Sequence, residues 1–275
     1  MVFFRTKDDM VVPAVTADQM REVDRMAVEE FGLGILQMME NAGRNLALHV
    51  MDMLDRGKAR PEPCPEPFDF AQDKQGRRGS QRGEVTVLAG SGGNGGGGLC
   101  CARHLHNRGF KVWVVLDRDP RMLRGAAAHQ LNILQAAGLQ PADPAQAGEL
   151  MGRSQIVVDA LIGYGLRGAP RGRTAELIEL CNQHAARVLS LDVPSGLDAT
   201  TGEAPGPVVR PERTLTLALP KTGLQHVPGD LYLADIGIPP EVFQRLGVPF
   251  QPPFEEKYWI PLIRTRARIE IPGSS

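Results

Sequence analysis

The chain has 275 residues, 42% of them hydrophobic, which suits one large domain of roughly 200 to 250 residues with loosely attached ends. Its 31 basic and 32 acidic residues give a net charge of −1, which excludes the uniformly basic surface that is typical of proteins that bind nucleic acids or acidic membranes. No apolar run approaches the ~20 residues that cross a bilayer, and the segment from Met1 to Val15 has no signal-peptide core. We therefore expect a small molecule as the partner, with no nucleic acid and no membrane.

The four cysteines lack the CxxC spacing of zinc sites and redox pairs. Cys64 lies in a Pro-rich stretch, Cys100 and Cys101 are adjacent in a helical pattern, and Cys181 stands alone. Buried thiols are expected from this usage, in a reducing compartment such as the cytoplasm.

Residues 16 to 54 predict two helices. A capping start at Thr16 to Gln19 opens the first, a break at Phe31 to Gly34 ends it, and the second runs from Ile35 to Leu54. Residues 56 to 83 then turn rich in Pro, Gly, Arg and Gln and lose all periodicity. Because such a stretch buries too little apolar surface to offset its ordering entropy, we expect a low-complexity insertion there.

Strands and helices alternate beyond the insertion. The expected strands are EVTVLAG, KVWVVLD, IVVDALIG, RVLSLDVPSG, TLTLALP and GDLYLADIGIP, and the expected helices are GLCCARHLHNRG, RGAAAHQLNILQAAG and RTAELIELCNQHA. The strands are short and apolar on both faces, as in a parallel sheet covered by helices. The pattern predicts a three-layer α-β-α, Rossmann-like, doubly wound fold with a mostly parallel sheet. From Val248 onward the sequence is Pro-rich and aperiodic, so we expect a tail or a strap over the domain.

Three loops follow predicted strands, at the edge where such sheets bind ligands. The loop Gly90 to Gly98 opens a helix that we expect to start at Leu99, and its backbone amides could cradle a phosphate. A plain flexible turn is the alternative. The loop from Asp159 to Gly168 offers a second Gly-x-Gly-x-x-Gly cradle, and Asp192 to Asp198 forms the third loop.

Polar side chains of these loops are expected to converge. Asp192 and Ser195 can face the same crevice as Asp159 and Asn94. Two carboxylates around one point repel each other unless a cation lies between them or one is protonated. The constellation predicts a metal-ion or acid/base site, although Asp159 could instead merely cap the next turn.

Several of these motifs carry a family resemblance. LQMMENAGR, GSGGNGGGGLCCARHL, VVDALIGYGLRG, LSLDVPSGLDATTG and LALPKTG resemble the NAD(P)H-hydrate epimerase family (the YjeF N-terminal domain) in order and spacing. The resemblance covers residues 16–247 apart from the insertion, and it leaves an N-terminal arm (1–15) and a C-terminal tail (248–275). It implies a homodimeric isomerase that interconverts the R and S epimers of hydrated NADH and NADPH, with a bound potassium ion.

The resemblance also implies site residues. It assigns potassium ligands to Asn94, Asp159 and Ser195. The implied substrate-binding positions are Gly93, Asn94, Gly95, Gly96, Gly97, Gly163, Tyr164, Gly165, Leu166, Arg167, Gly168, Ala169 and Asp192. The family's glycine loop usually reads GNNGGDG, whereas this chain has Gly93 for the first Asn and Gly97 for the Asp. The two changes imply a weakened site.

Epimerisation needs an acid/base group beside the reacting hydroxyl and stabilisation of a transient cation. Asp192 is the candidate for that role, and Lys221 is a second candidate that could equally be a surface lysine. Two other functions stay open. One is a non-catalytic nucleotide-binding or scaffold protein with a degenerate site, and the other is a dehydrogenase in which Asp117 binds a ribose.

Overall fold

The computed structural model describes residues 2–56 and 83–264. Most of the predicted insertion (56–83) and the last part of the predicted tail (248–275) lie outside these ranges. The described strands form one nine-stranded sheet in the order β2-β1-β9-β8-β7-β6-β5-β3-β4.

Six parallel strands make up one continuous part of the sheet, from β8 to the edge strand β4. They are β3 (Glu84–Ala89), β4 (Lys111–Leu116), β5 (Ile156–Ala160), β6 (Val188–Leu191), β7 (Arg213–Leu217) and β8 (Asp230–Ala234). All residues of β5 and β6 are buried, because helices cover both faces of the sheet. The predicted Rossmann-like, mostly parallel fold is confirmed.

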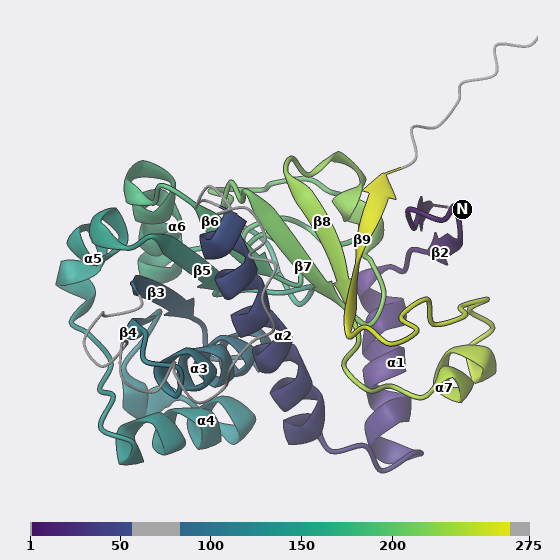
Figure 1. Cartoon of the computed structure of the whole chain (residues 1–275), viewed down its shortest axis with the longest axis horizontal. Coiled ribbons are helices and arrows are strands. Elements are labelled where there is room, and N and C mark those ends of the chain that lie inside the picture. The colour runs from purple at the N-terminus through teal and green to yellow at the C-terminus, as the bar shows by residue number, and fades with distance from the viewer. Residues whose placement is uncertain (1, 57–82, 265–275) are drawn as a thin grey trace, which may run out of the picture.

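Helices cover the two faces in two separate layers (Figure 1). The helices α2 (Ile35–Arg56), α3 (Gly93–His106) and α4 (Gly125–Ala136) share one apolar cluster with β3, β4 and β5. The helices α5 (Ala147–Arg153) and α6 (Gly172–His184) pack on the opposite face. Towards β8 that opposite face is covered by α1 (Ala17–Glu29) and α7 (Pro240–Arg245). Alternate residues of β8 face the two helix layers: Leu231 packs with α1, and Tyr232 packs with α2.

Both predicted ends differ from expectation. The predicted tail contains β9 (Trp259–Arg264), which pairs antiparallel with β8, and the predicted arm contains β1 (Phe3–Arg5) and β2 (Val11–Pro13), which extend the sheet beyond β9. Pro261 hid this strand from sequence analysis, since proline lacks a ladder donor. Pairing between β9 and β1 begins only at Ile263, so Pro261 has no neighbour on that side.

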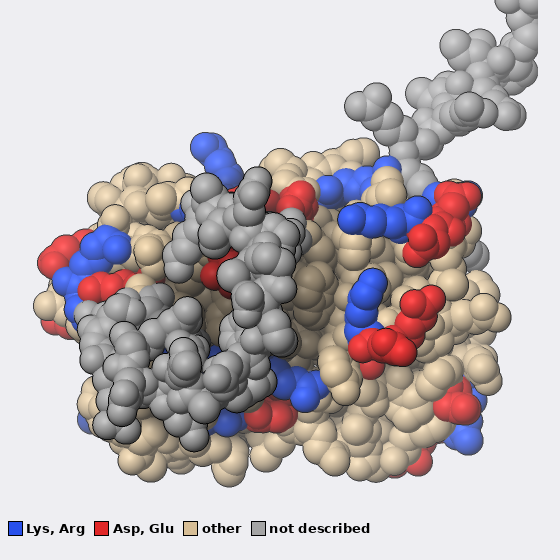
Figure 2. Space-filling model, in the orientation of Figure 1, with Lys and Arg blue, Asp and Glu red and all other residues tan. Residues whose placement is uncertain are grey.

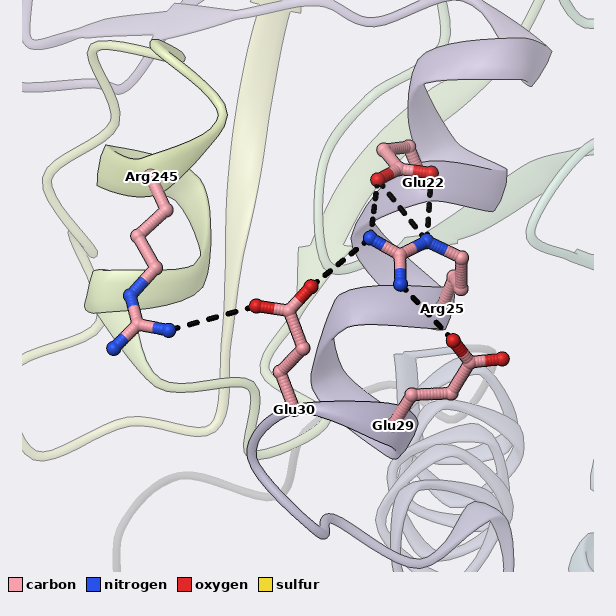
Figure 3. A network of polar contacts seen from close by, with 5 residues as sticks. All are labelled: Glu22, Arg25, Glu29, Glu30 and Arg245. Atoms are coloured by element: carbon pink, nitrogen blue, oxygen red, sulfur yellow. Dashed lines mark hydrogen bonds and ion pairs between the residues drawn. The ribbon is translucent and has the colours of Figure 1, made fainter.

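The first helix starts as predicted. Thr16 caps α1 in a reciprocal capping box with Gln19. Figure 3 shows how the other end of α1 is tied to α7 by a surface network in which Arg25 donates to Glu22, Glu29 and Glu30. Arg245 of α7 reaches Glu30 at 3.5 Å. Exposed pairs of this kind stabilise little, so we attribute the docking of α7 mainly to its buried Phe243.

Charge is mixed on the molecular surface. On the face drawn in Figure 2, described basic and acidic side chains lie interspersed and do not form one large patch of a single sign. Among the described helices, none has the length and apolar character needed to cross a bilayer.

Candidate active site

A cavity of about 630 Å³ opens at the carboxyl ends of the parallel strands. Residues from α1 and α2 line it, together with the loops after β3, β4, β5 and β6. Its size falls in the range of small-molecule and cofactor sites. All three predicted loops contribute to it, through Asn94, Gly163 and Asp192 among others.

Asp192 lies in a strained turn at the end of β6. Its φ is +67°, and the amide of Val193 donates to the carbonyl of Leu191, two residues back. A turn of this type is rare and costs free energy in any residue other than glycine. Ala218, at the end of neighbouring β7, repeats the arrangement with a φ of +60°. This turn places Asp192 among the residues that line the cavity.

Lys221 is buried and forms an ion pair with Asp192. The lysine donates from Nζ to Oδ1 of Asp192 and, at 2.9 Å, to the carbonyl of Leu217. The amide of Tyr164 donates to the other carboxylate oxygen at 3.2 Å. The alternative of a solvated surface lysine at position 221 is therefore wrong.

Asp24 is a cavity residue that sequence analysis missed. It projects from α1, and its carboxylate accepts a hydrogen bond from the hydroxyl of Tyr164. Burial raises the pKa of Asp24, against the opposing effects of the Tyr164 hydrogen bond and of nearby Lys221. The only available signal was its place beside Val23 at the border of an apolar helix face, which is too weak to mark a site.

Asp159 and Ser195 contact each other, but neither is among the residues that line the cavity, where Asn94 and Asp192 lie. Fully buried Asp159 accepts hydrogen bonds from the hydroxyl and amide of Ser195, from the hydroxyl of Ser190 at 2.7 Å and from the amide of Leu161 at 3.3 Å. Burial raises the pKa of Asp159, and these hydrogen bonds oppose the rise. The hydroxyl of Ser195 also contacts the backbone of Ile162.

Asn94, in the first turn of α3, lies near Gly163 and Asp192. A Cβ added to Gly163 would lie 3.0 Å from Oδ1 of Asn94 and 3.1 Å from Oδ2 of Asp192. Gly163 therefore brings these two side chains close to one another. The Nδ2 atom of Asn94 is buried and has no hydrogen-bond partner among the described residues.

The glycine-rich segment differs from the predicted loop. Helix α3 begins at Gly93, six residues before the predicted start at Leu99, so most of the glycines are helical. A Cβ on Gly95 would lie 1.7 Å from the carbonyl oxygen of Gly90, and one on Gly98 would lie 2.6 Å from Cβ of Ala160. These glycines let α3 approach the sheet closely. The amides of its first turn have no intrahelical acceptor and remain available to an anion.

The second predicted cradle is only partly in the cavity. Gly163, Tyr164 and Gly165 line it, whereas Leu166, Arg167, Gly168 and Ala169 are not among its lining residues, and Arg167 is exposed. The cavity lining also includes Asp117 and Arg118, which follow β4, and Thr174 of α6.

The parallel sheet and the cavity at its carboxyl edge define a doubly wound α/β protein with a ligand site in the position usual for that class. The family model of the YjeF-related protein N-terminus matches residues 35–223. The chain belongs to this family, which confirms the resemblance predicted from its motifs.

Curated relatives align with this protein along most of the chain. An NAD(P)H-hydrate epimerase of Dehalogenimonas lykanthroporepellens is 46% identical over 262 residues, which are 94% of this chain and 96% of that protein. Another, of Rhodopirellula baltica, is 32% identical over 250 residues, or 88% of this chain and 91% of that protein. The crystal structure of yeast ynu0 (YNL200c) has a TM-score of 0.73 at 22% identity and covers 92% of this chain and 100% of the yeast chain, so it supports the fold alone.

Proposed function

We propose that the chain is an NAD(P)H-hydrate epimerase that interconverts the R and S epimers of hydrated NADH and NADPH. The observation that carries this proposal is the buried Asp192–Lys221 ion pair at the wall of a nucleotide-sized cavity. The two relatives described above that bear this name, matched over most of their length, support it.

The reaction inverts the configuration at one ring carbon, C6, because its hydroxyl leaves from one face and returns on the other. The hydroxyl on C6 takes up a proton and leaves as water while the ring nitrogen donates electron density, which leaves C6 planar and cationic. Water then adds to the opposite face and gives up a proton. The protein must therefore supply a proton donor and acceptor and must stabilise the transient cation.

The carboxylates of the cavity suit these tasks. Asp192 stabilises the cation, because its turn and the Lys221 ion pair fix the carboxylate beside the cavity. Lys221 acts as a positioning residue through Asp192. Asp24, whose pKa burial raises, exchanges the proton of the hydroxyl and is oriented by Tyr164.

The substrate phosphates would lie at the start of α3, against the amides of Gly93, Asn94 and Gly95. We retain Gly96, Gly97 and the segment from Gly163 to Ala169 as proposed substrate positions because they flank this helix start. The cavity lining supports Gly97 and the segment's first three residues most directly.

Potassium fits the residues proposed to hold it. Asp159 is a buried carboxylate whose charge is compensated by no basic side chain among its described hydrogen-bond partners, and Asn94 offers an amide oxygen, Oδ1. With the hydroxyl of Ser195 they form an all-oxygen donor set of the kind that hard cations prefer. A cation held there would offset the cost of burying Asp159 and order the neighbouring loops.

A homodimer in the cytoplasm completes the proposal. Cys100, Cys101 and Cys181 are buried free thiols, which suits a reducing compartment, and Cys64 lies outside the described residues. Light scattering on the purified protein tests the dimer, and a monomeric mass at micromolar concentration would contradict it.

Conversion of one pure epimer of hydrated NADH into the other, followed by chromatography, tests the function. We expect conversion well above the uncatalysed rate, with loss of that excess in Asp192→Asn. No acceleration by folded wild-type protein would contradict the epimerase and favour the non-catalytic scaffold, for which Gly93 and Gly97 are the motivation. Hydride transfer to an acceptor would instead support the dehydrogenase.

A further inference from the structure

The end of the cavity farthest from Asp192 carries its own polar group. In the sheet, β5 and β3 separate β6 from β4, so the order along the cavity is Asp192 after β6, Gly163 after β5, the start of α3 after β3, and Asp117 after β4. Neighbouring strands lie about 4.8 Å apart, which puts Asp192 and Asp117 roughly 14 Å apart along this edge. This length suits a dinucleotide with its phosphates at α3.

Arg118 is held in place at this far end. Its Nε and Nη2 donate to the two carboxylate oxygens of Asp117 at 2.9 and 3.0 Å, and the hydroxyl of Thr174 donates to the same carboxylate at 3.2 Å. The Asp117 side chain is 4% exposed and that of Arg118 is 40% exposed. Within residues 2–56 and 83–264 the third guanidinium nitrogen, Nη1, has no hydrogen bond. Arg118 therefore lines the cavity with a fixed orientation and a spare donor.

Other arginines lie near Arg118 in the chain. Residues 117–125 and 171–173 together contain five arginines and two aspartates. Arg121, through its hydrogen bonds, and Arg173, through its charge, contribute to lowering the pKa of Asp119 to about 2, which places side chains of both segments near each other. The opposite end of the cavity carries Asp24 and the Asp192–Lys221 pair. Of the five arginines, Arg118 alone is among the residues that line the cavity, so it is the donor that this end offers to an anion.

We propose that Arg118, oriented by Asp117, binds the 2′-phosphate of the substrate's adenosine ribose and so favours hydrated NADPH over hydrated NADH. The proposal rests on the epimerase function proposed above. A phosphate monoester carries a charge near −2 at neutral pH, and arginine binds it through charge-assisted hydrogen bonds, for which Nη1 of Arg118 is available. In doubly wound proteins, the end of the second strand is where the ribose and its 2′-phosphate are recognised. β4 occupies the corresponding place here, because it follows β3 and α3.

Epimerisation of the two hydrates tests the proposal. We expect the ratio of kcat/KM for hydrated NADPH to that for hydrated NADH to fall about tenfold to a hundredfold in Arg118→Ala, mostly through KM. Asp117→Asn should lower the same ratio by a smaller factor, because Arg118 remains but is less firmly oriented. Arg121→Ala is the matched control, since Arg121 is 89% exposed and pairs with Asp119, and it should leave the ratio unchanged. An unchanged ratio in Arg118→Ala would overturn the proposal.

A binding measurement separates this subsite from the epimerase function. By calorimetry, wild-type protein should bind 2′-phospho-ADP-ribose more tightly than ADP-ribose, and Arg118→Ala should bind the two alike. If the protein shows this difference but epimerises neither hydrate, the function is wrong and the subsite stands. If it epimerises both hydrates but binds the two ligands equally, the subsite is wrong and the function stands.

Discussion

Lys221 donates a hydrogen bond to Asp192 where both residues are almost completely buried, at 1% and 3% exposure. The partners follow adjacent strands, β7 and β6, and each strand ends in a residue with positive φ. Removing one partner from such a pair leaves an uncompensated buried charge, which is far more costly than replacing both.

Lys221→Met therefore tests the ion pair. We expect a loss of about 3 to 5 kcal/mol in the free energy of unfolding. Epimerase activity should fall by at least about a hundredfold, because the Asp192 carboxylate is no longer fixed. Urea denaturation and initial rates measure the two effects. The double variant Lys221→Met/Asp192→Asn should recover part of the stability and none of the activity; additive losses would mean that the pair is not coupled.

Asp24 predicts a pH dependence. Because burial raises its pKa in the folded state, its contribution to stability is full below the unfolded value of about 3.9 and is lost as the pH rises through the raised value. Asp24→Asn should therefore gain stability relative to wild type as the pH is increased from 4 to 8, measured by urea denaturation. Exposed Asp18 on the same helix provides the control Asp18→Asn. A difference that does not change with pH would contradict the assigned environment of Asp24.

Potassium should stabilise the folded protein. A ligand at ten times its dissociation constant adds about 1.4 kcal/mol, so Tm should rise more in potassium chloride than in tetramethylammonium chloride at equal concentration. Asp159→Asn should lose this difference, because the buried anionic ligand is gone. A potassium-specific shift that survives in the variant would remove Asp159 from the proposed site.

The glycines of α3 should differ sharply in their tolerance of a side chain. Gly95→Ala places Cβ 1.7 Å from the carbonyl oxygen of Gly90, so we expect destabilisation of about 3 kcal/mol or more or failure to fold. Gly93→Ala, two residues earlier, has no atom within 4 Å of the new Cβ. It should be neutral or stabilise by up to about 1 kcal/mol through helix propensity. Equal effects in thermal denaturation would contradict the close approach of α3 to the sheet.

Gly93 and Gly97 also test whether the site is weakened. Neither has a positive φ, so both positions accept a side chain, although a Cβ on Gly97 lies 2.8 Å from Cδ2 of Leu191 and this side chain must shift. The double variant Gly93→Asn/Gly97→Asp should bind hydrated cofactor about tenfold to a hundredfold more tightly, by one charge-assisted hydrogen bond to a substrate hydroxyl. Titration calorimetry measures this gain. No binding by either folded protein would contradict the proposed substrate.

The sequence alone determined the parallel core and the loops of the site. Short strands that are apolar on both faces require helices on both sides, and parallel strands bring their carboxyl ends to one edge. The convergence of Asp159 with Ser195, and of Asn94 with Asp192 at Gly163, follows from that rule, because each residue comes directly after its strand or opens the following helix.

Only the tertiary structure decided the contacts made between distant segments. Asp24 meets Tyr164 from 140 residues away, and β1 pairs with β9 from opposite ends of the chain. Neither contact leaves a local pattern, because a polar residue at the border of a helix face reads as solvated and a strand with a proline reads as a loop. Likewise, the glycines of α3 looked like a flexible loop, since low helix propensity is overridden only when close packing on the sheet is present.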